Sequence, residues 1–144
     1  MSRNRILFLA IIVVCTCALL LPAASCSRAP KLAPTAIVTG QITLDDKPVT
    51  CGEIAFLPDS SKGTTGPMGM SPIGEDGRYE IRTAGKKGAL VGWHKIRIMA
   101  IDETKPDKPW IIPIKYSNPD ESGLTFEVKA NQENKHDFPL KSKP

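Results

Sequence analysis

The feature that most constrains the fold of this chain is a series of short segments in which apolar and polar residues alternate. From Ala36 onward these segments recur between turns rich in Gly, Pro, Asn and Asp, and no stretch repeats with the period of an amphipathic helix. An alternating segment buries one face and exposes the other, as a half-buried β-strand does. The pattern therefore predicts an all-β domain.

The predicted strands are residues 37–44, 52–57, 78–83, 94–101, 124–129 and 135–140, within a domain of residues 36–142. The turn at Asp45-Asp46-Lys47-Pro48 predicts a hairpin between the first two strands. Residues 58–74 hold four Gly and three Pro, so we expect a long surface loop there. Because antiparallel strands with one apolar face need a second sheet to cover it, we expect a two-sheet sandwich of about seven strands with Greek-key connections.

Residues 1–25 have the pattern of a signal peptide. Two arginines precede an unbroken apolar run from Ile6 to Leu21, which is shorter than the roughly 20 residues of a membrane-spanning helix. Cys26 then follows the small residues Ala23-Ala24-Ser25, an order similar to the bacterial lipobox, although Ala23 stands where that motif has Leu, Val or Ile. We expect residues 1–25 to be removed and Cys26 to be the site of lipid attachment.

Residues 26–35 combine this lipid anchor with a tether rich in Pro and Ala, which cannot build a helix. Several acyl chains on Cys26 would hold the protein on a bilayer, since each buried methylene contributes about 0.8 kcal/mol. The expected location is therefore the cell envelope, exported and membrane-anchored, in the periplasm or on the outer surface. The alternatives are a secreted soluble protein and an uncleaved, slightly short membrane anchor.

The charge of the chain excludes one class of partner. Of 19 Lys and Arg, two lie in the predicted leader, so 17 remain against 15 Asp and Glu. They are scattered singly, apart from Lys86-Lys87, and so form neither a basic stripe nor a polybasic cluster for lipid headgroups. We therefore expect no nucleic-acid binding.

Five motifs, taken in order, resemble carboxypeptidase regulatory-like domains, which belong with the transthyretin-like sandwiches. They are Val38 to Val49 with Ile54 to Pro58, Asp76 to Ile81, Gly92 to Ile98, Ile112 to Tyr116 with Ser122 to Thr125, and Phe138 to Leu140. The resemblance covers about residues 36–142 and implies a seven-stranded sandwich like that of small bacterial envelope lipoproteins. The motif residues also have plain folding roles: Gly77 allows a tight turn, Tyr79 buries its ring, and Gly40 lets the strand bend or another backbone approach.

Few residues of the mature chain could carry catalysis. Its histidines are His94 and His136, and Cys51 is its single unmodified thiol, so a small Cys–His hydrolase is one alternative function. Cys51, however, stands at a strand start and is expected to be a small buried side chain. The transthyretin-like 5-hydroxyisourate hydrolases close with Tyr-Arg-Gly-Ser, and this chain closes with Phe138-Pro139-Leu140 followed by a short basic tail. We expect no enzyme activity and no cofactor.

Metal binding is a second alternative. Met68 and Met70 supply thioethers, which suit cuprous ion, so the chain could be a periplasmic small-ligand or copper-binding protein. A thioether site usually needs at least three donors, and nothing in the sequence brings Met99 or a histidine to these two. We therefore expect no metal site.

The candidate interaction surface consists of Trp93 and of Trp110, Ile111 and Ile112. The second group is apolar, is broken by Pro113 and is flanked by charged residues, as in a loop that either caps the core or docks a partner. The expected function is a non-catalytic exported lipoprotein that presents a β-sandwich as a binding or structural module. Its partners would be the membrane, through the lipid, and a protein or carbohydrate of the envelope.

Overall fold

The structure, a computed structural model, describes residues 33–102, 104–105, 107 and 109–143. The predicted leader and Cys26 lie outside these residues. The described part consists of strands, loops and two short 3-10 turns, η1 (Ser60–Lys62) and η2 (Ile114–Ser117). Within it, no helix has the length and apolar composition needed to cross a membrane.

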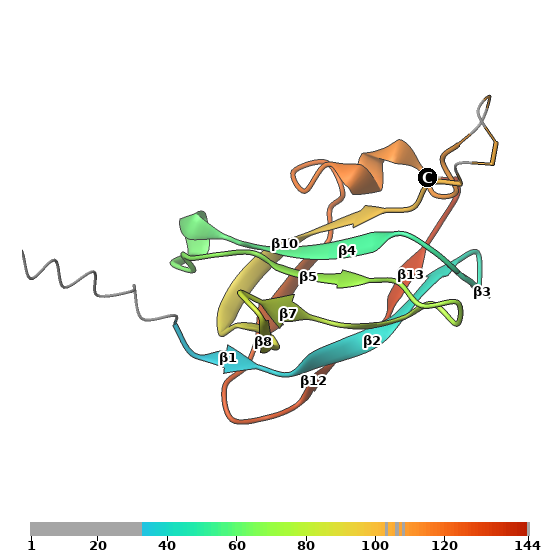
Figure 1. The fold of residues 1–144 in the computed structure, drawn as a ribbon. Coiled ribbons are helices and arrows are strands. Elements are labelled where there is room, and N and C mark those ends of the chain that lie inside the picture. Colours follow the sequence, from blue (N-terminus) through green and yellow to red (C-terminus); the bar gives the residue numbers. More distant parts are fainter. Residues whose placement is uncertain (1–32, 103, 106, 108, 144) are drawn as a thin grey trace, which may run out of the picture. The chain divides into compact units, whose positions relative to one another are not determined.

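Two main sheets form the domain (Figure 1), which confirms the predicted all-β, two-sheet architecture. The larger sheet has six strands in the order β11 (Thr125–Val128), β10 (Gly92–Met99), β4 (Glu53–Pro58), β5 (Gly69–Pro72), β7 (Arg82–Thr83) and β8 (Lys86–Lys87). The smaller sheet has five, with β2 (Val38–Leu44) paired to β12 (Asn134–Lys135), β13 (Phe138–Leu140), β3 (Lys47–Pro48) and β6 (Arg78–Glu80). A two-stranded pair joins β1 (Thr35–Ala36) to β9 (Ala89–Leu90).

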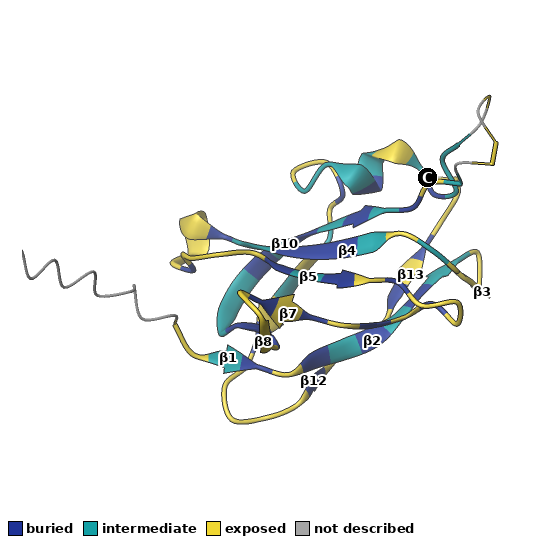
Figure 2. Ribbon diagram, in the orientation of Figure 1, coloured by how far each residue is buried: buried dark blue, intermediate teal, exposed yellow. Residues whose placement is uncertain are grey.

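The alternation of the sequence corresponds to the burial of the strands. On β2, Val38 and Ile42 are fully buried while Thr39 is half-buried, and on β10 Ile96 and Ile98 are fully buried while Arg97 is half-buried. Figure 2 shows the buried residues gathered on the central strands and the exposed ones at turns and edges. Each sheet thus buries one face against the other, which is how the alternating pattern avoids exposing apolar surface.

Phe56 is the centre of the core. Its ring is fully buried, and its centroid lies 5.8 Å from that of His94, 6.2 Å from those of Tyr79 and Phe126, and 6.3 Å from that of Phe138. These four rings come from strands of both sheets, and the separations are those of favourable edge and tilted aromatic pairs. Phe56 therefore joins the two sheets.

The predicted hairpin between residues 37–44 and 52–57 is wrong. The turn at Asp45 and Asp46, with φ of 48° and 68°, returns the chain only as the two-residue β3. β4 instead pairs with β5 and β10 in the other sheet. The inward side chains of β2 and β4 therefore face each other across the core, so each strand covers the apolar face of the other.

Residues 58–74 are not only a surface loop, because β5 lies in the middle of the larger sheet. Gly69 and Ser71 face inward and are buried, and the Ser71 hydroxyl accepts the backbone N–H of Glu80 at 3.1 Å. The sequence pattern missed this strand because its inward positions carry a glycine and a serine instead of apolar side chains.

The C-terminal strands β12 and β13 run parallel to β2, where antiparallel pairing was expected. Phe138 and Leu140 are buried against the core, as predicted. The His136 N–H donates to the Thr39 carbonyl, so even-numbered residues of this segment pair with β2 and odd-numbered ones face the sheet edge. Pro139, which has no N–H, falls on an edge position, where proline is tolerated.

Gly40 admits another backbone, as predicted. A Cβ at this position would overlap the carbonyl oxygen of His136, which accepts a hydrogen bond from the Tyr79 hydroxyl at 2.7 Å. Burial of Tyr79, helped by the nearby charge of Asp137, raises the pKa of its phenol above the usual range. Gly77, with φ of 79°, makes the predicted tight turn that leads into β6. The glycine, the tyrosine and the carbonyl together fix the C-terminal segment against β2.

Candidate functional site

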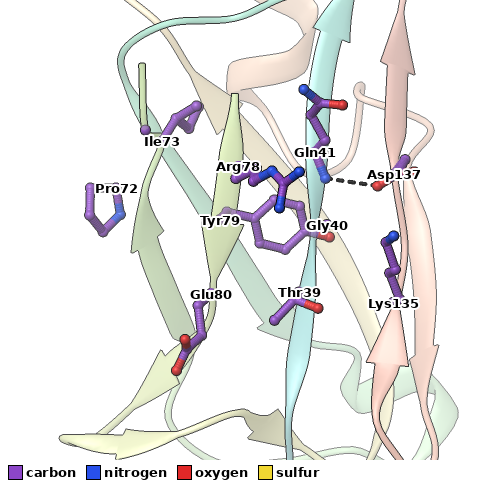
Figure 3. A pocket seen from close by; sticks show the side chains of 11 residues that line it. Thr39, Gly40, Gln41, Pro72, Ile73, Arg78, Tyr79, Glu80, Lys135 and Asp137 are labelled. Carbon is purple, nitrogen blue, oxygen red and sulfur yellow. Dashed lines mark hydrogen bonds between the residues drawn. The ribbon is translucent and has the colours of Figure 1, made fainter. Parts of the chain in front are cut away.

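A groove of about 580 Å³ crosses the smaller sheet (Figure 3). This volume lies within the range of small-molecule sites in proteins. β2, β6 and the segment around β12 supply most of its lining, and the last residue of β5 with the two residues after it supplies one wall. The lining residues are Thr39, Gly40, Gln41, Pro72, Ile73, Gly74, Arg78, Tyr79, Glu80, Lys135 and Asp137.

Strand register places the polar side chains of the groove in two rows across the sheet. In the first row, Thr39 on β2 lies opposite Glu80 on β6 and Lys135 on β12. In the second row, Gln41 lies opposite Arg78 and is bonded to Asp137. Residues two apart on a strand point to the same face, so both rows open to the same side. Each row thus has a basic and an acidic end with a neutral polar residue between them.

Asp137 is held in place by the backbone of β2. Its Oδ1 accepts the N–H of Gln41 at 2.8 Å, drawn as the dashed line in Figure 3. The Gln41 side chain is fixed as well, because its Nε2 donates to the Asp76 carbonyl at 2.7 Å. These bonds leave Asp137 Oδ2 and Gln41 Oε1 available for a ligand.

Two of the four charged residues in the groove pair with neighbours. Arg78 lies 3.2 Å from Asp76 with both side chains well exposed, and Lys87 lies 2.9 Å from Glu80. The hydrogen bond and charge of Lys87 hold the pKa of Glu80 below its ordinary value. Among the described residues, no ion pair engages Lys135 or Asp137. The charges of the four groove residues cancel formally.

The predicted interaction residues Trp93 and Trp110 lie near opposite ends of β10. Trp93 is half-buried near the start of β10, with the Lys62 ammonium 3.7 Å from its ring centroid. Trp110, also half-buried, bridges to Ile101, just beyond the end of β10. Eight residues of extended chain separate the positions of Trp93 and Ile101, about 26 Å at ~3.3 Å per residue. The two tryptophans therefore do not form a single platform.

The neighbours of Trp110 divide between core and surface. Ile112 is buried and belongs to the hydrophobic core, while Ile111 is half-buried and packs against it. Ile114, at the start of η2, is 63% exposed. This segment therefore caps the core with Ile112 and leaves Ile114 facing outward.

The three methionines in the described part of the chain do not form one cluster. Met68 is exposed ahead of β5, and Met70 lies within β5 opposite Ala55 and Arg82. Met99 pairs with Glu53 on the far side of β4, away from Met70. Among the described residues, no three His, Cys, Asp or Glu side chains are grouped as they would be around a metal ion.

Cys51 is half-buried instead of fully buried, because it precedes β4 at the sheet margin. Its Sγ lies 3.8 Å from the Ile101 carbonyl oxygen, at the far end of β10 from His94. Seven residues of extended chain separate His94 from Ile101, about 23 Å at ~3.3 Å per residue. His136 stacks on Phe126, which pairs with His94, so both histidines lie at the end remote from the thiol. The three residues of the hydrolase alternative are not brought together.

His94 has an unusual environment for an ionisable group. It is 1% exposed, and its Nδ1 lies 3.1 Å from the Gly92 carbonyl, which can only accept, so Nδ1 carries the proton. Its Nε2 is buried and has no hydrogen-bond partner within the described part of the chain. Burial lowers the pKa of His94 below the ordinary value of 6.5.

We expect acid to destabilise the domain through His94. Below about pH 6.5 the unfolded chain binds a proton that the folded state resists, so the free energy of unfolding falls as pH falls. Above that pH both states are neutral and His94 has no effect. The slope approaches about 1.4 kcal/mol per pH unit for one proton, and urea unfolding at pH 7.5, 6.5 and 5.5 measures it.

The variant His94→Leu tests this assignment. It should remove most of the slope between pH 6.5 and 5.5. His136→Gln is the matched control, because burial also lowers the pKa of His136, which is only half-buried and lies beside the opposing charge of Asp137. An undiminished slope in His94→Leu would contradict the assignment.

Comparison with known proteins gives little support for any specific activity. No protein-family model matches the chain, and no curated protein matches it significantly. Among solved structures, a 9R-lipoxygenase from Cyanothece PCC8801 is similar, with 22% identity and a TM-score of 0.35 over 74% of this chain. The chain spans 16% of the lipoxygenase, and a likeness this weak assigns neither a fold family nor an activity.

Sequence reasoning missed the groove residues. Thr39, Gln41, Arg78 and Glu80 occupy the polar positions of half-buried strands, which on sequence grounds are ordinary solvent-facing positions. Lys135 and Asp137 reach the same face because the register of the last segment places Lys135 opposite Thr39 and Phe138 opposite Ile42. The groove is built from three separate segments of the chain, and the sequence pattern of any one of them does not reveal it.

Proposed function

We propose that this protein is an exported lipoprotein, anchored by acylated Cys26, whose β-sandwich is a non-catalytic binding module of the cell envelope. We also propose that the sandwich is a member of the carboxypeptidase regulatory-like domains, which its sequence resembles. The observation that carries it is Cys26 itself, which directly follows a small-residue cleavage pattern at the end of an apolar run.

The position at which the folded domain begins supports the proposal. The Pro34 carbonyl accepts the Val91 N–H at 2.9 Å, and β1 starts at the next residue, Thr35. Only a short segment rich in Pro and Ala separates Cys26 from this point. An acylated Cys26 would therefore hold the sandwich close to the bilayer surface.

A binding role is supported by where the polar groups lie. The groove collects four charged side chains, whereas Cys51 is separated from both histidines. Nucleophilic catalysis needs nucleophile and base within hydrogen-bond reach. The groove instead presents donors and acceptors, of which Asp137 and Gln41 are held by hydrogen bonds, and such groups suit recognition.

Mass spectrometry of the mature N-terminus, after expression of the full chain in a bacterium, tests the anchor. We expect an N-terminal Cys26 carrying the mass of attached acyl chains, and recovery in the membrane fraction. Cys26→Ala should release the protein or leave it unprocessed, while Cys51→Ala is the matched control and should stay membrane-bound. An unmodified Cys26 or an intact leader in the wild-type protein would overturn the proposal.

A further inference from the structure

We propose that the groove over β12, β2 and β6 binds a neutral oligosaccharide. The groove offers hydrogen-bonding side chains on both sides of β2. This inference rests on the proposed binding role and names the class of ligand. It is carried by the mixture of donors and acceptors among six side chains that β2, β6 and the segment between β12 and β13 place on one face.

The free polar groups of the groove are mixed. Donors come from the guanidinium of Arg78 and the ammonium of Lys135, and acceptors from Asp137 Oδ2 and Gln41 Oε1. Thr39, in the middle of the first row, can both donate and accept. A sugar hydroxyl also donates and accepts, so a chain of hydroxyl groups can satisfy such a surface.

Charge disfavours ionic ligands. Arg78 and Lys135 are offset by Glu80 and Asp137, so neither a polyanion nor a polycation gains from the field of the groove as a whole. Two of these charges are already engaged by Asp76 and Lys87. The affinity for a neutral polar ligand does not depend on the net charge of the groove, so the cancellation of charges does not weaken its binding.

Addition of a peptide as an extra strand is disfavoured by topology. β2 runs along the middle of the groove and is paired with β6 on one side and with β12 and β13 on the other. Its backbone donors and acceptors are therefore used within the sheet, whereas strand addition needs a free edge. A ligand that lies over β2 must therefore be recognised by side chains, whereas the outer edges of β6 and β12 are not paired with another described strand of the smaller sheet.

The groove also offers an apolar wall. Pro72 is exposed, and Ile73 beside it is largely buried; both line the groove next to β6 (Figure 3). A saccharide presents C–H groups on the faces of its rings and hydroxyls at their edges, so a wall of this kind beside polar side chains matches both. Small-molecule sites commonly combine apolar lining with a few placed polar groups.

Asp137 is preorganised for this role. Its bond to the Gln41 N–H fixes the carboxylate before any ligand arrives, so little side-chain entropy remains to be lost on binding. Asp137→Asn would keep an oxygen for the Gln41 N–H while replacing the outward acceptor by a donor. It therefore changes recognition without removing the strand contact.

The experiment uses the full, processed chain, ¹⁵N-labelled, in a zwitterionic detergent without a sugar headgroup. The probes are cellotetraose, maltotetraose, mannotetraose and chitotetraose, with a tetrapeptide of alternating lysine and glutamate as the charged competitor. We expect amide shifts concentrated at Thr39, Gln41, Arg78 and Glu80 with at least one saccharide, and none with the peptide.

Matched variants locate the site. Asp137→Asn and Lys135→Met should each weaken binding at least tenfold, as expected for a lost hydrogen bond to a charged group. Asp46→Asn and Lys129→Met, exposed positions outside the groove lining, should bind as the wild type does.

Three outcomes would overturn the inference: no shifts with any of the four saccharides, preference for the peptide, or binding unchanged in both groove variants. None of them bears on whether Cys26 is acylated, so the anchor and the ligand class stand or fall separately.

Discussion

Replacing Gly40 by alanine is expected to destabilise the domain by about 2–6 kcal/mol. The new methyl group would overlap the His136 carbonyl, which is backbone and cannot rotate away. Overpacking costs about 1–3 kcal/mol. Displacing the carbonyl would also strand the buried Tyr79 hydroxyl, at a further ~1–3 kcal/mol. Urea unfolding followed by circular dichroism measures the loss.

Gly74→Ala is the matched control for this variant. A Cβ on Gly74 would lie 3.1 Å from Asp76 Oδ1, the end of an exposed side chain that needs to shift by only a few tenths of an ångström and can keep its bond to the Arg78 N–H. We expect a loss below about 1 kcal/mol there, as for surface substitutions in general. Equal losses of unfolding free energy in the two variants would show that the close approach of the His136 carbonyl is not what makes Gly40→Ala destabilising.

Replacing Phe56 by alanine should cost about 3–5 kcal/mol, the range for truncating a buried aromatic side chain. The ring is fully buried and packs against Tyr79, Phe126 and Phe138 from the strands around it. Its removal would leave a cavity between the two sheets. The free energy of unfolding and the near-ultraviolet dichroism of the aromatic residues should both fall.

Phe56→Leu separates the loss of the ring from the loss of volume. Leucine fills much of the space, so we expect a smaller cost, near the ~1.5 kcal/mol upper limit of volume-conserving exchanges. A loss under about 1.5 kcal/mol in Phe56→Ala would contradict the central place assigned to this ring.

The strands that the sequence predicts well are those whose inward side chains are large and apolar. β10 alternates Ile96 and Ile98 with charged residues, and the turn before Tyr79 carries a glycine that needs positive φ. Such signals depend only on residues close in the sequence, so they can be recognised without knowledge of the tertiary fold. β5 was not predicted, because Gly69 and Ser71 are buried by their neighbours and give no apolar signal of their own.

Pairing was harder to predict than strand location. The sequence of β4 predicts that Ile54 and Phe56 face the core, but not which strands lie beside β4. A tight turn after β2 favoured a hairpin with the next long strand, and β3 met that requirement with two residues. The groove depends on these pairings, so sequence reasoning could not assemble it either.

The pairing of β13 with β2 has a consequence for when this chain can finish folding. Gln41 and Asp137, which bond to each other, are 96 positions apart, so nearly the whole domain must be available before that contact closes. Long-range contacts of this kind are made late and slow the search for the native state. Until residues 134–140 have reached the compartment where the domain folds, β2 stays without the two strands that pair with it in parallel.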